Sequence, residues 1–169
     1  MLYDSAARSA EVLRLDVEDL DLANHRARVT RKGGGHDIVI WKSRTARLLS
    51  NYLEGRRDGP VFLTERHAKS DAYIGPGDRD SKGRARLSYE RAEALFRQWT
   101  TAVLGKRATL HQLRHSALTH DAEDGASAPL LMTKSGHASI RTLGKYARPG
   151  TEALARWQQE TDRTRRGRD

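Results

Sequence analysis

The sequence lacks several features on which whole classes of chemistry depend. None of its 169 residues is cysteine, which excludes disulfides, thiolate nucleophiles and cysteine-ligated zinc. No apolar run approaches the roughly 20 residues needed to span a bilayer, and the first residues lack the basic-then-apolar order of a signal peptide. We therefore expect a cytoplasmic chain without a membrane partner, whose covalent chemistry uses hydroxyl, amine, carboxyl or imidazole groups.

Positive charge is what the chain has in excess. Lysine and arginine together number 31 against 22 aspartates and glutamates, which gives a formal net charge of +9 and an isoelectric point near 10.2. Such an excess favours a polyanionic partner, because binding releases the counterions condensed on it. Nucleic acid is the first interpretation. An anionic membrane surface is the second, and the lack of a long apolar run or signal peptide weakens it.

The spacing of apolar residues predicts a mostly helical α+β domain. Val12 and Leu15 lie at helical spacing in a short first helix over 7–15. Alternating apolar and polar residues then predict a small three-stranded antiparallel sheet, with three glycines in its second turn, at 17–22, 27–30 and 38–41.

Helices are expected over the rest of the chain, apart from one polar segment. Ala46, Leu49 and Leu53 form a stripe that is typical of a helix over 43–57. Residues 65–86 are polar, rich in glycine and without periodicity, so a surface loop in motion is expected there. Glycine or proline then separates five further helical patterns, at 88–104, 109–123, 127–135, 140–146 and 151–162.

His111 and Arg114 form the first candidate site. They lie near the start of the helix expected at 109–123, three residues apart and therefore on one face of it. A helix N-terminus favours anions and an arginine adds a planar fork of donors, so this face can grip a phosphate. His115 lies at the spacing of a zinc-binding pair with His111, but no third-ligand motif accompanies them, and no metal site is predicted.

The segment Thr109 to Ser116, with the sequence TLHQLRHS, resembles the strongest motif of the tyrosine recombinases, which include phage integrases and Xer-type resolvases. Four further matches lie in the family's order, at Ala7 to Leu13, at Val17 to Asp21, at the glycine hairpin that begins with Lys32, and at Ser135 to Thr142 with Tyr146 after it. Together they cover nearly the whole chain. The resemblance implies the DNA breaking-and-rejoining fold of this family.

The resemblance also implies a covalent reaction on duplex DNA that needs no cofactor. Tyr146 falls where the family keeps its nucleophile, and its phenol would attack a phosphodiester to form a 3′-phosphotyrosine. Arg8 and Arg114 would neutralise the charge of the phosphorane. His137 would add a hydrogen bond to the same oxygens.

Two proton carriers and two supporting residues complete the implied site. A phenol of reference pKa about 10 loses its proton as it attacks, and the 5′-oxygen gains one as it leaves. By resemblance, His111 is the base near the nucleophile and Lys32 is the acid for the leaving oxygen. Glu11, one turn from Arg8, would hold that guanidinium in place, and His115 would be a packing or supporting residue.

The chain departs from the family at its start. Members usually carry an N-terminal helical domain that closes a C-shaped clamp around DNA, whereas here Leu2 to Ser5 resemble only the last turn of a curtailed opening helix. A fragment, a misassigned start or a truncated gene would each explain this. We expect the catalytic domain over 1–162 and a frayed basic tail over 163–169, with weak or partner-dependent activity.

The expected assembly is a homotetramer on double-stranded DNA. The protein is expected to be bacterial or phage-derived, cytoplasmic and associated with the nucleoid. In this family the segment after the nucleophile often docks on a neighbouring protomer, and Leu154 and Trp157 are the candidate anchors for such a helix exchange. Three alternatives stay open: a catalytically idle DNA-binding remnant, a type IB topoisomerase and, from another class, a metal-dependent nuclease.

Overall fold

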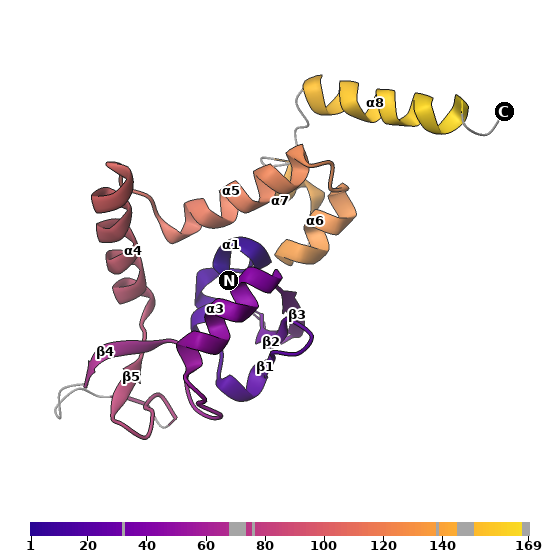
Figure 1. The fold of residues 1–169 in the computed structure, drawn as a ribbon. Helices are drawn as coiled ribbons and strands as arrows, with labels where there is room; N and C mark the ends of the chain where they lie inside the picture. Colours follow the sequence, from indigo (N-terminus) through magenta and orange to yellow (C-terminus); the bar gives the residue numbers. More distant parts are fainter. Residues whose placement is uncertain (32, 68–73, 76, 138, 145–150, 167–169) are drawn as a thin grey trace.

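The chain forms two short helices, a three-stranded sheet, one helix, a two-stranded sheet and then a series of helices (Figure 1). The computed structural model describes residues 1–31, 33–67, 74–75, 77–137, 139–144 and 151–166. The helices are α1 (Leu2–Ser5), α2 (Ser9–Leu13), α3 (Ser43–Leu53), α4 (Tyr89–Leu104), α5 (Leu110–Glu123), α6 (Ala128–Ser135), α7 (Ile140–Leu143) and α8 (Thr151–Arg166). The strands are β1 (Leu20–Asp21), β2 (Arg26–Thr30), β3 (His36–Ile40), β4 (Leu63–His67) and β5 (Arg84–Arg86).

The first three strands form the antiparallel sheet that the alternating pattern predicts, in the order β1-β2-β3. Along β2, Ala27 and Val29 are buried while the residues between them are exposed. They share a core with the buried stripe of α3, which includes Leu49 and Leu53 as expected. The three-stranded sheet is therefore confirmed, although Val17–Asp19 is a 3₁₀ turn and not part of a strand.

The expectation of an irregular loop over 65–86 is wrong at both of its ends. There β4 and β5 pair as a second, two-stranded antiparallel sheet. Arg86 holds this sheet to the domain, because its Nη2 lies 2.6 Å from Asp16 Oδ1, its Nε 2.5 Å from Asp78 Oδ1, and its Nη1 donates to the carbonyl of Leu15 at 3.1 Å. Asp16 and Leu15 lie 70 and 71 residues from Arg86 in the chain, so local periodicity carries no signal of these two contacts.

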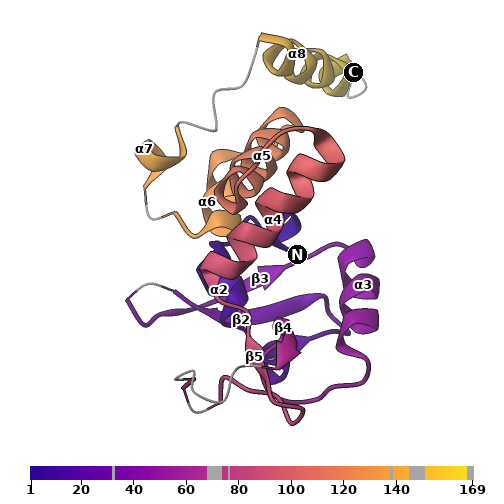
Figure 2. The same ribbon diagram turned by 90° about the vertical axis from the view of Figure 1, so that its left-hand side faces the viewer.

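The second half is helical, as its apolar spacing predicts, and the mostly helical α+β class is confirmed. Buried Leu118 of α5 packs with Leu131 of α6 and Leu143 of α7 in a second core. The last helix, α8, continues to Arg166 instead of ending at 162, and in both views it lies apart from the other helices (Figures 1 and 2). Among the described residues, no helix combines the length and apolar character needed to cross a bilayer.

Candidate active site

Helix α5 positions the two residues first singled out from the sequence. Thr109 caps it: its hydroxyl accepts from the backbone N–H of Gln112 at 3.2 Å, and the Gln112 side chain accepts from the Thr109 N–H at 2.7 Å. This capping box fixes where the helix begins. His111 then lies exposed in the first turn, whereas Arg114, one turn later, is only 5% exposed.

The buried Arg114 guanidinium is held by acceptors from two other segments. It donates to the carbonyl oxygen of Ala6, which follows α1, and at 2.9 Å to that of Ser135 at the end of α6. Its Nη2 also lies 3.1 Å from Nε2 of His137. Because the two carbonyls come from distant parts of the chain, the domain must be folded before this guanidinium is in place.

The contact with Arg114 determines the protonation of His137. A guanidinium has no acceptor, so His137 Nε2 accepts and the ring proton is on Nδ1. This Nδ1–H donates to the hydroxyl of Ser135 at 2.7 Å, and that hydroxyl donates to the carbonyl of Leu131 at 2.6 Å. His137 is thus a neutral imidazole of one tautomer, held between an arginine and a serine.

Electrostatics favour the same neutral state of His137. Burial lowers the pKa of its imidazole from 6.5 to about 4, and the positive charges of Arg114, Arg8 and Arg31 add to the effect. Three guanidinium groups therefore act on one ring. Such a concentration of fixed positive charge is suited to an anionic oxygen group.

Arg8 and Glu11 lie together at the start of α2, as their spacing predicts. Arg8 Nη1 lies 2.8 Å from Glu11 Oε1, and the Arg8 backbone N–H donates to Glu11 Oε2 at 3.1 Å. Glu11 is buried, whereas the Arg8 side chain is 44% exposed. The guanidinium of Arg8 is therefore oriented by a fixed carboxylate while part of it remains open to solvent.

Arg31 is the residue of this site that the sequence reasoning missed. Its Nη1 lies 2.6 Å from Glu11 Oε2, so Glu11 binds two arginines. Nothing in composition or motif distinguished Arg31 from the other basic residues; the one available signal was its place immediately before Lys32. We call Arg8, Glu11, Arg31, Arg114 and His137 the arginine cluster.

His111 pairs with the other histidine of its helix face. The Nε2 atoms of His111 and His115 lie 2.7 Å apart, and their rings meet edge to face at 4.4 Å. One Nε2 must donate and the other accept, so only one of the two rings carries a proton at Nε2. Within the described part of the chain, no three potential metal-ligating side chains gather at one point.

Two predicted site residues lie outside the described residues. These are Lys32, which follows Arg31, and Tyr146, which follows α7 in the chain. The structure thus brings together Arg8, Glu11, Arg114 and His137, and it places His111 and His115 against each other. The catalytic roles of all eight residues stay predictions.

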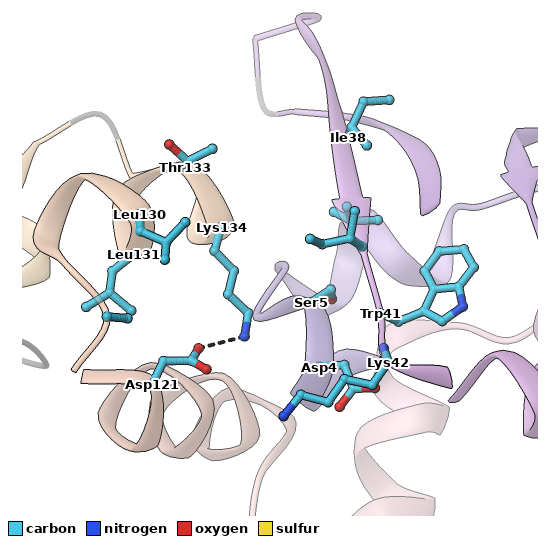
Figure 3. A pocket seen from close by; sticks show the side chains of 13 residues that line it. Asp4, Ser5, Ile38, Trp41, Lys42, Asp121, Leu130, Leu131, Thr133 and Lys134 are labelled. Carbon is cyan, nitrogen blue, oxygen red and sulfur yellow. Dashed lines mark hydrogen bonds and ion pairs between the residues drawn. The ribbon is translucent and has the colours of Figure 1, made fainter. Parts of the chain in front are cut away.

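A second surface feature is a groove of about 450 Å³ between β3 and α6 (Figure 3). Ile38 and Ile40 line it from the strand and Leu130 from the helix, and each of the three is more than half exposed. Lys134 Nζ lies 2.6 Å from Asp121 Oδ2 and links α6 to α5 beside the groove. Exposed apolar side chains that line one groove suit a partner that covers them.

Comparisons with known proteins agree with this architecture. Residues 1–152 match the model of the phage integrase family. The chain is 32% identical over 160 residues to tyrosine recombinase XerC of Pelobacter propionicus. The aligned part is 90% of this chain and 47% of that relative. The chain is also 29% identical over 157 residues to tyrosine recombinase XerA of Pyrococcus horikoshii. Here the aligned part is 91% of this chain and 50% of that relative. The chain thus spans about half the length of these relatives.

Solved structures share the fold. A crystal structure of XerA recombinase superposes with a TM-score of 0.72 at 23% identity, over 95% of this chain and 54% of that one. The structure of the Tn1549 transposon integrase in complex with circular intermediate DNA superposes with a TM-score of 0.64 at 20% identity. This superposition covers 95% of this chain and 57% of that one. The match of the family model over most of the residues, on a fold that these structures share, shows that the chain belongs to the phage integrase family.

Proposed function

We propose that this chain cuts and rejoins duplex DNA at specific sites through a covalent 3′-phosphotyrosine on Tyr146. The observation that carries the proposal is the arginine cluster, in which three guanidinium groups surround one neutral imidazole. Its relatives are named tyrosine recombinases, and one solved neighbour is held on DNA. The net charge of +9 supports the same substrate.

The reaction exchanges one phosphoester for another. The phenolic oxygen of Tyr146 attacks the phosphorus, the bond to the 5′-oxygen breaks, and the 5′-hydroxyl leaves with a proton. A 5′-hydroxyl of the partner strand then loses its proton as it attacks the phosphotyrosine. The bond from phosphorus to the Tyr146 oxygen breaks, the phenol regains a proton, and a phosphodiester is restored. Bond energy is conserved at each step, so the reaction needs no nucleotide cofactor.

Two members of the arginine cluster, Arg8 and Arg114, stabilise the charge that develops on the non-bridging oxygens. Arg8 is partly exposed and can reach a phosphate, while Arg114 is already fixed by two carbonyls and so needs no reorganisation. An arriving phosphate adds negative charge and raises the pKa of His137, because it offsets the three guanidinium groups that lower it. His137 then takes up a proton and donates from Nε2 to the phosphate.

Proton transfer falls to the residues that the family resemblance indicates. His111 accepts the phenolic proton, and its exposed position in the first turn of α5 leaves it accessible to a partner group. His115, 2.7 Å away, holds its tautomer. Lys32 donates to the leaving 5′-oxygen, as its place in the glycine hairpin suggests.

Assembly joins copies of the chain through α8 and the groove between β3 and α6. Leu154 and Trp157 of α8 are 50% and 61% exposed, so this helix carries an apolar surface that its own chain leaves uncovered. The groove carries the exposed Ile38, Ile40 and Leu130. Docking α8 of one protomer in the groove of the next would cover both surfaces at once and build a ring of protomers on DNA.

The decisive experiment traps the covalent intermediate. Nicked duplexes pooled from candidate sites of the source genome release a short strand after cleavage, so the adduct accumulates. The expected result is an SDS-stable protein–DNA adduct that forms in EDTA and is absent in Tyr146→Phe. An adduct that persists in Tyr146→Phe would refute this nucleophile, and a cut that EDTA abolishes would indicate a metal-dependent nuclease.

Three further outcomes separate the remaining alternatives. Relaxation of supercoiled plasmid without strand exchange would indicate a topoisomerase. Because the match covers 47% of the Pelobacter relative, the assay is repeated with the chain joined to the part of that relative that the match leaves out. An adduct only in that fusion means that this chain holds the chemistry and needs help to bind DNA. An adduct in neither indicates a DNA-binding remnant.

The absence of cysteine from the sequence gives a clean test of the α8 interface. Mixing the Ile40→Cys protein with the Leu154→Cys protein on DNA should give a disulfide-linked dimer under mild oxidation. The matched control replaces Ile40→Cys by Arg47→Cys on the exposed face of α3. Equal cross-linking of both pairs would contradict the proposed docking.

A further inference from the structure

Arg31 makes contacts that the proposed reaction does not use. Its side chain is only 12% exposed, and the guanidinium lies between two carboxylates. Nε and Nη2 both donate to Asp37 Oδ2, at 3.0 and 2.8 Å, while Nη1 donates to Glu11 Oε2 at 2.6 Å. An arginine occupied on both edges is suited to orienting its neighbours rather than to binding substrate.

The backbone of Arg31 also closes the hairpin. Its N–H donates to the carbonyl of Gly35 at 2.7 Å, and its carbonyl accepts from the N–H of Gly34 at 3.0 Å. Lys32 is the next residue in the chain. The side-chain bond to Asp37 reaches across to β3, so both strands of the hairpin are tied to one guanidinium.

The same guanidinium lies against the turn that precedes His137. Gly136 ends α6 with φ +64°, and a Cβ added there would lie 2.4 Å from Arg31 Cζ. No other residue type fits this position without displacing Arg31. Arg31 therefore contacts three segments at once: the start of α2 through Glu11, β3 through Asp37, and the end of α6 at Gly136.

From these contacts we infer that Arg31 is a positioning residue, which fixes the hairpin beside Lys32 to the Glu11 carboxylate and to the turn before His137. Its effect on DNA cleavage rests on the proposed function, but its effect on the geometry of the site does not. Glu11 couples the two roles, because the carboxylate that receives Arg31 at one oxygen orients Arg8 from the other. Movement of the hairpin is thus transmitted to Arg8.

The test compares Arg31→Met with Arg26→Met, a control at the start of β2, the strand that Arg31 follows. Arg26 also pairs with a carboxylate, Asp21 at 2.8 Å, but its side chain is 52% exposed. Two measurements need no DNA: amide exchange at Gly34, and the titration of His137 followed by NMR of ¹⁵N-labelled histidine. Among the described residues, Arg114 of α5, Arg8 before α2 and Arg31 are the charged groups acting on His137.

In Arg31→Met, the Gly34 backbone amide should exchange with solvent about tenfold faster than in the wild type, and the pKa of His137 should rise. Arg26→Met should change neither quantity. Arg31→Lys keeps the charge and loses the fork, so it should restore most of the His137 titration but not the Gly34 protection. Exchange and titration in Arg31→Met that equal those in Arg26→Met would overturn the inference.

Two additions keep the test decisive. If Arg31→Met fails to fold, Asp37→Asn retains the Glu11 contact and should still speed exchange at Gly34; unchanged exchange there overturns the inference. On DNA, adduct formation by Arg31→Met should be roughly 10- to 100-fold slower, with Arg26→Met as the reference. An inactive wild type would defeat the proposed function alone, since exchange and titration still decide the role of Arg31.

Discussion

The arginine cluster and the C-terminal helix are built in opposite ways. Arg114 is 5% exposed and binds carbonyl oxygens that follow α1 and end α6. Trp157 of α8 is 61% exposed, and the helix that carries it lies apart from the others (Figures 1 and 2). Tyr146 lies between the two in the chain. The folded chain thus holds the Arg114 guanidinium through its own contacts, whereas it leaves the Trp157 side chain of α8 exposed.

This difference suits an enzyme that cuts only within an assembly. Donors that are fixed before substrate arrives cost no reorganisation when charge develops. A helix with exposed apolar side chains gains stability when a partner covers it. On the proposed function, one protomer alone can bind a phosphodiester, while cleavage also needs α8 to dock on a neighbouring protomer. Changes to the cluster should therefore alter folding stability, and changes to α8 should not.

The largest effect is expected for Arg114→Met. Loss of the guanidinium leaves the buried carbonyls of Ala6 and Ser135 without their donor, at a cost of about 2–4 kcal/mol in the free energy of unfolding. Urea unfolding followed by circular dichroism measures this cost. The adduct rate, scored where both proteins are folded, should fall about 100- to 1000-fold. An adduct rate within a factor of a few of the wild type would remove Arg114 from the site.

The second-largest effect on the free energy of unfolding depends on pH and should come from His137. In the unfolded chain a histidine takes up a proton near pH 6.5, whereas burial and the arginines keep folded His137 neutral down to about pH 4. Between these values the unfolded state binds more protons, so the free energy of unfolding falls as the pH falls. In His137→Gln this contribution, on the order of 1 kcal/mol after allowance for solvent screening, disappears.

Urea unfolding at several pH values between 7 and 4.5 measures the difference between the two proteins. His36→Gln, an exposed substitution at the start of β3, is the matched control. The gap between wild type and His137→Gln should change across this range, while the gap between wild type and the control stays constant. Parallel curves for all three proteins would contradict a neutral His137.

The sequence predicted the features that depend on local pattern and motif order, and it missed those that depend on tertiary contacts. Short-range periodicity indicated the sheet and the stripe of α3, and motif order brought Arg8, Arg114 and His137 to one site. Arg31 could not be found in this way, because its bond to Glu11 joins residues 20 apart in the chain and depends on how the hairpin packs on α2. The contact of His111 with His115 likewise follows from rotamers, which spacing leaves open.

A smaller effect is expected from the cap of α5. Thr109→Ala removes the hydroxyl that accepts from Gln112 N–H, which should cost about 1 kcal/mol and shift the start of the helix that carries His111 and Arg114. Thr101→Ala, an exposed threonine within α4, controls for loss of a hydroxyl. Thermal unfolding should separate the two variants by several degrees. Equal melting temperatures would mean that the cap does not stabilise α5.

The smallest effect on stability is expected from Trp157→Ala. The side chain is 61% exposed, so the free energy of unfolding of the isolated protomer should change by less than about 0.5 kcal/mol. Covalent adduct per protomer should nevertheless fall, because on the proposed docking the substitution removes the anchor of α8 on its neighbour. Diluting the wild type at constant excess of DNA should lower the yield per protomer in the same way. A yield that is independent of dilution and of Trp157 would mean that one protomer completes its own site, and the contrast between the two regions would then concern shape and not function.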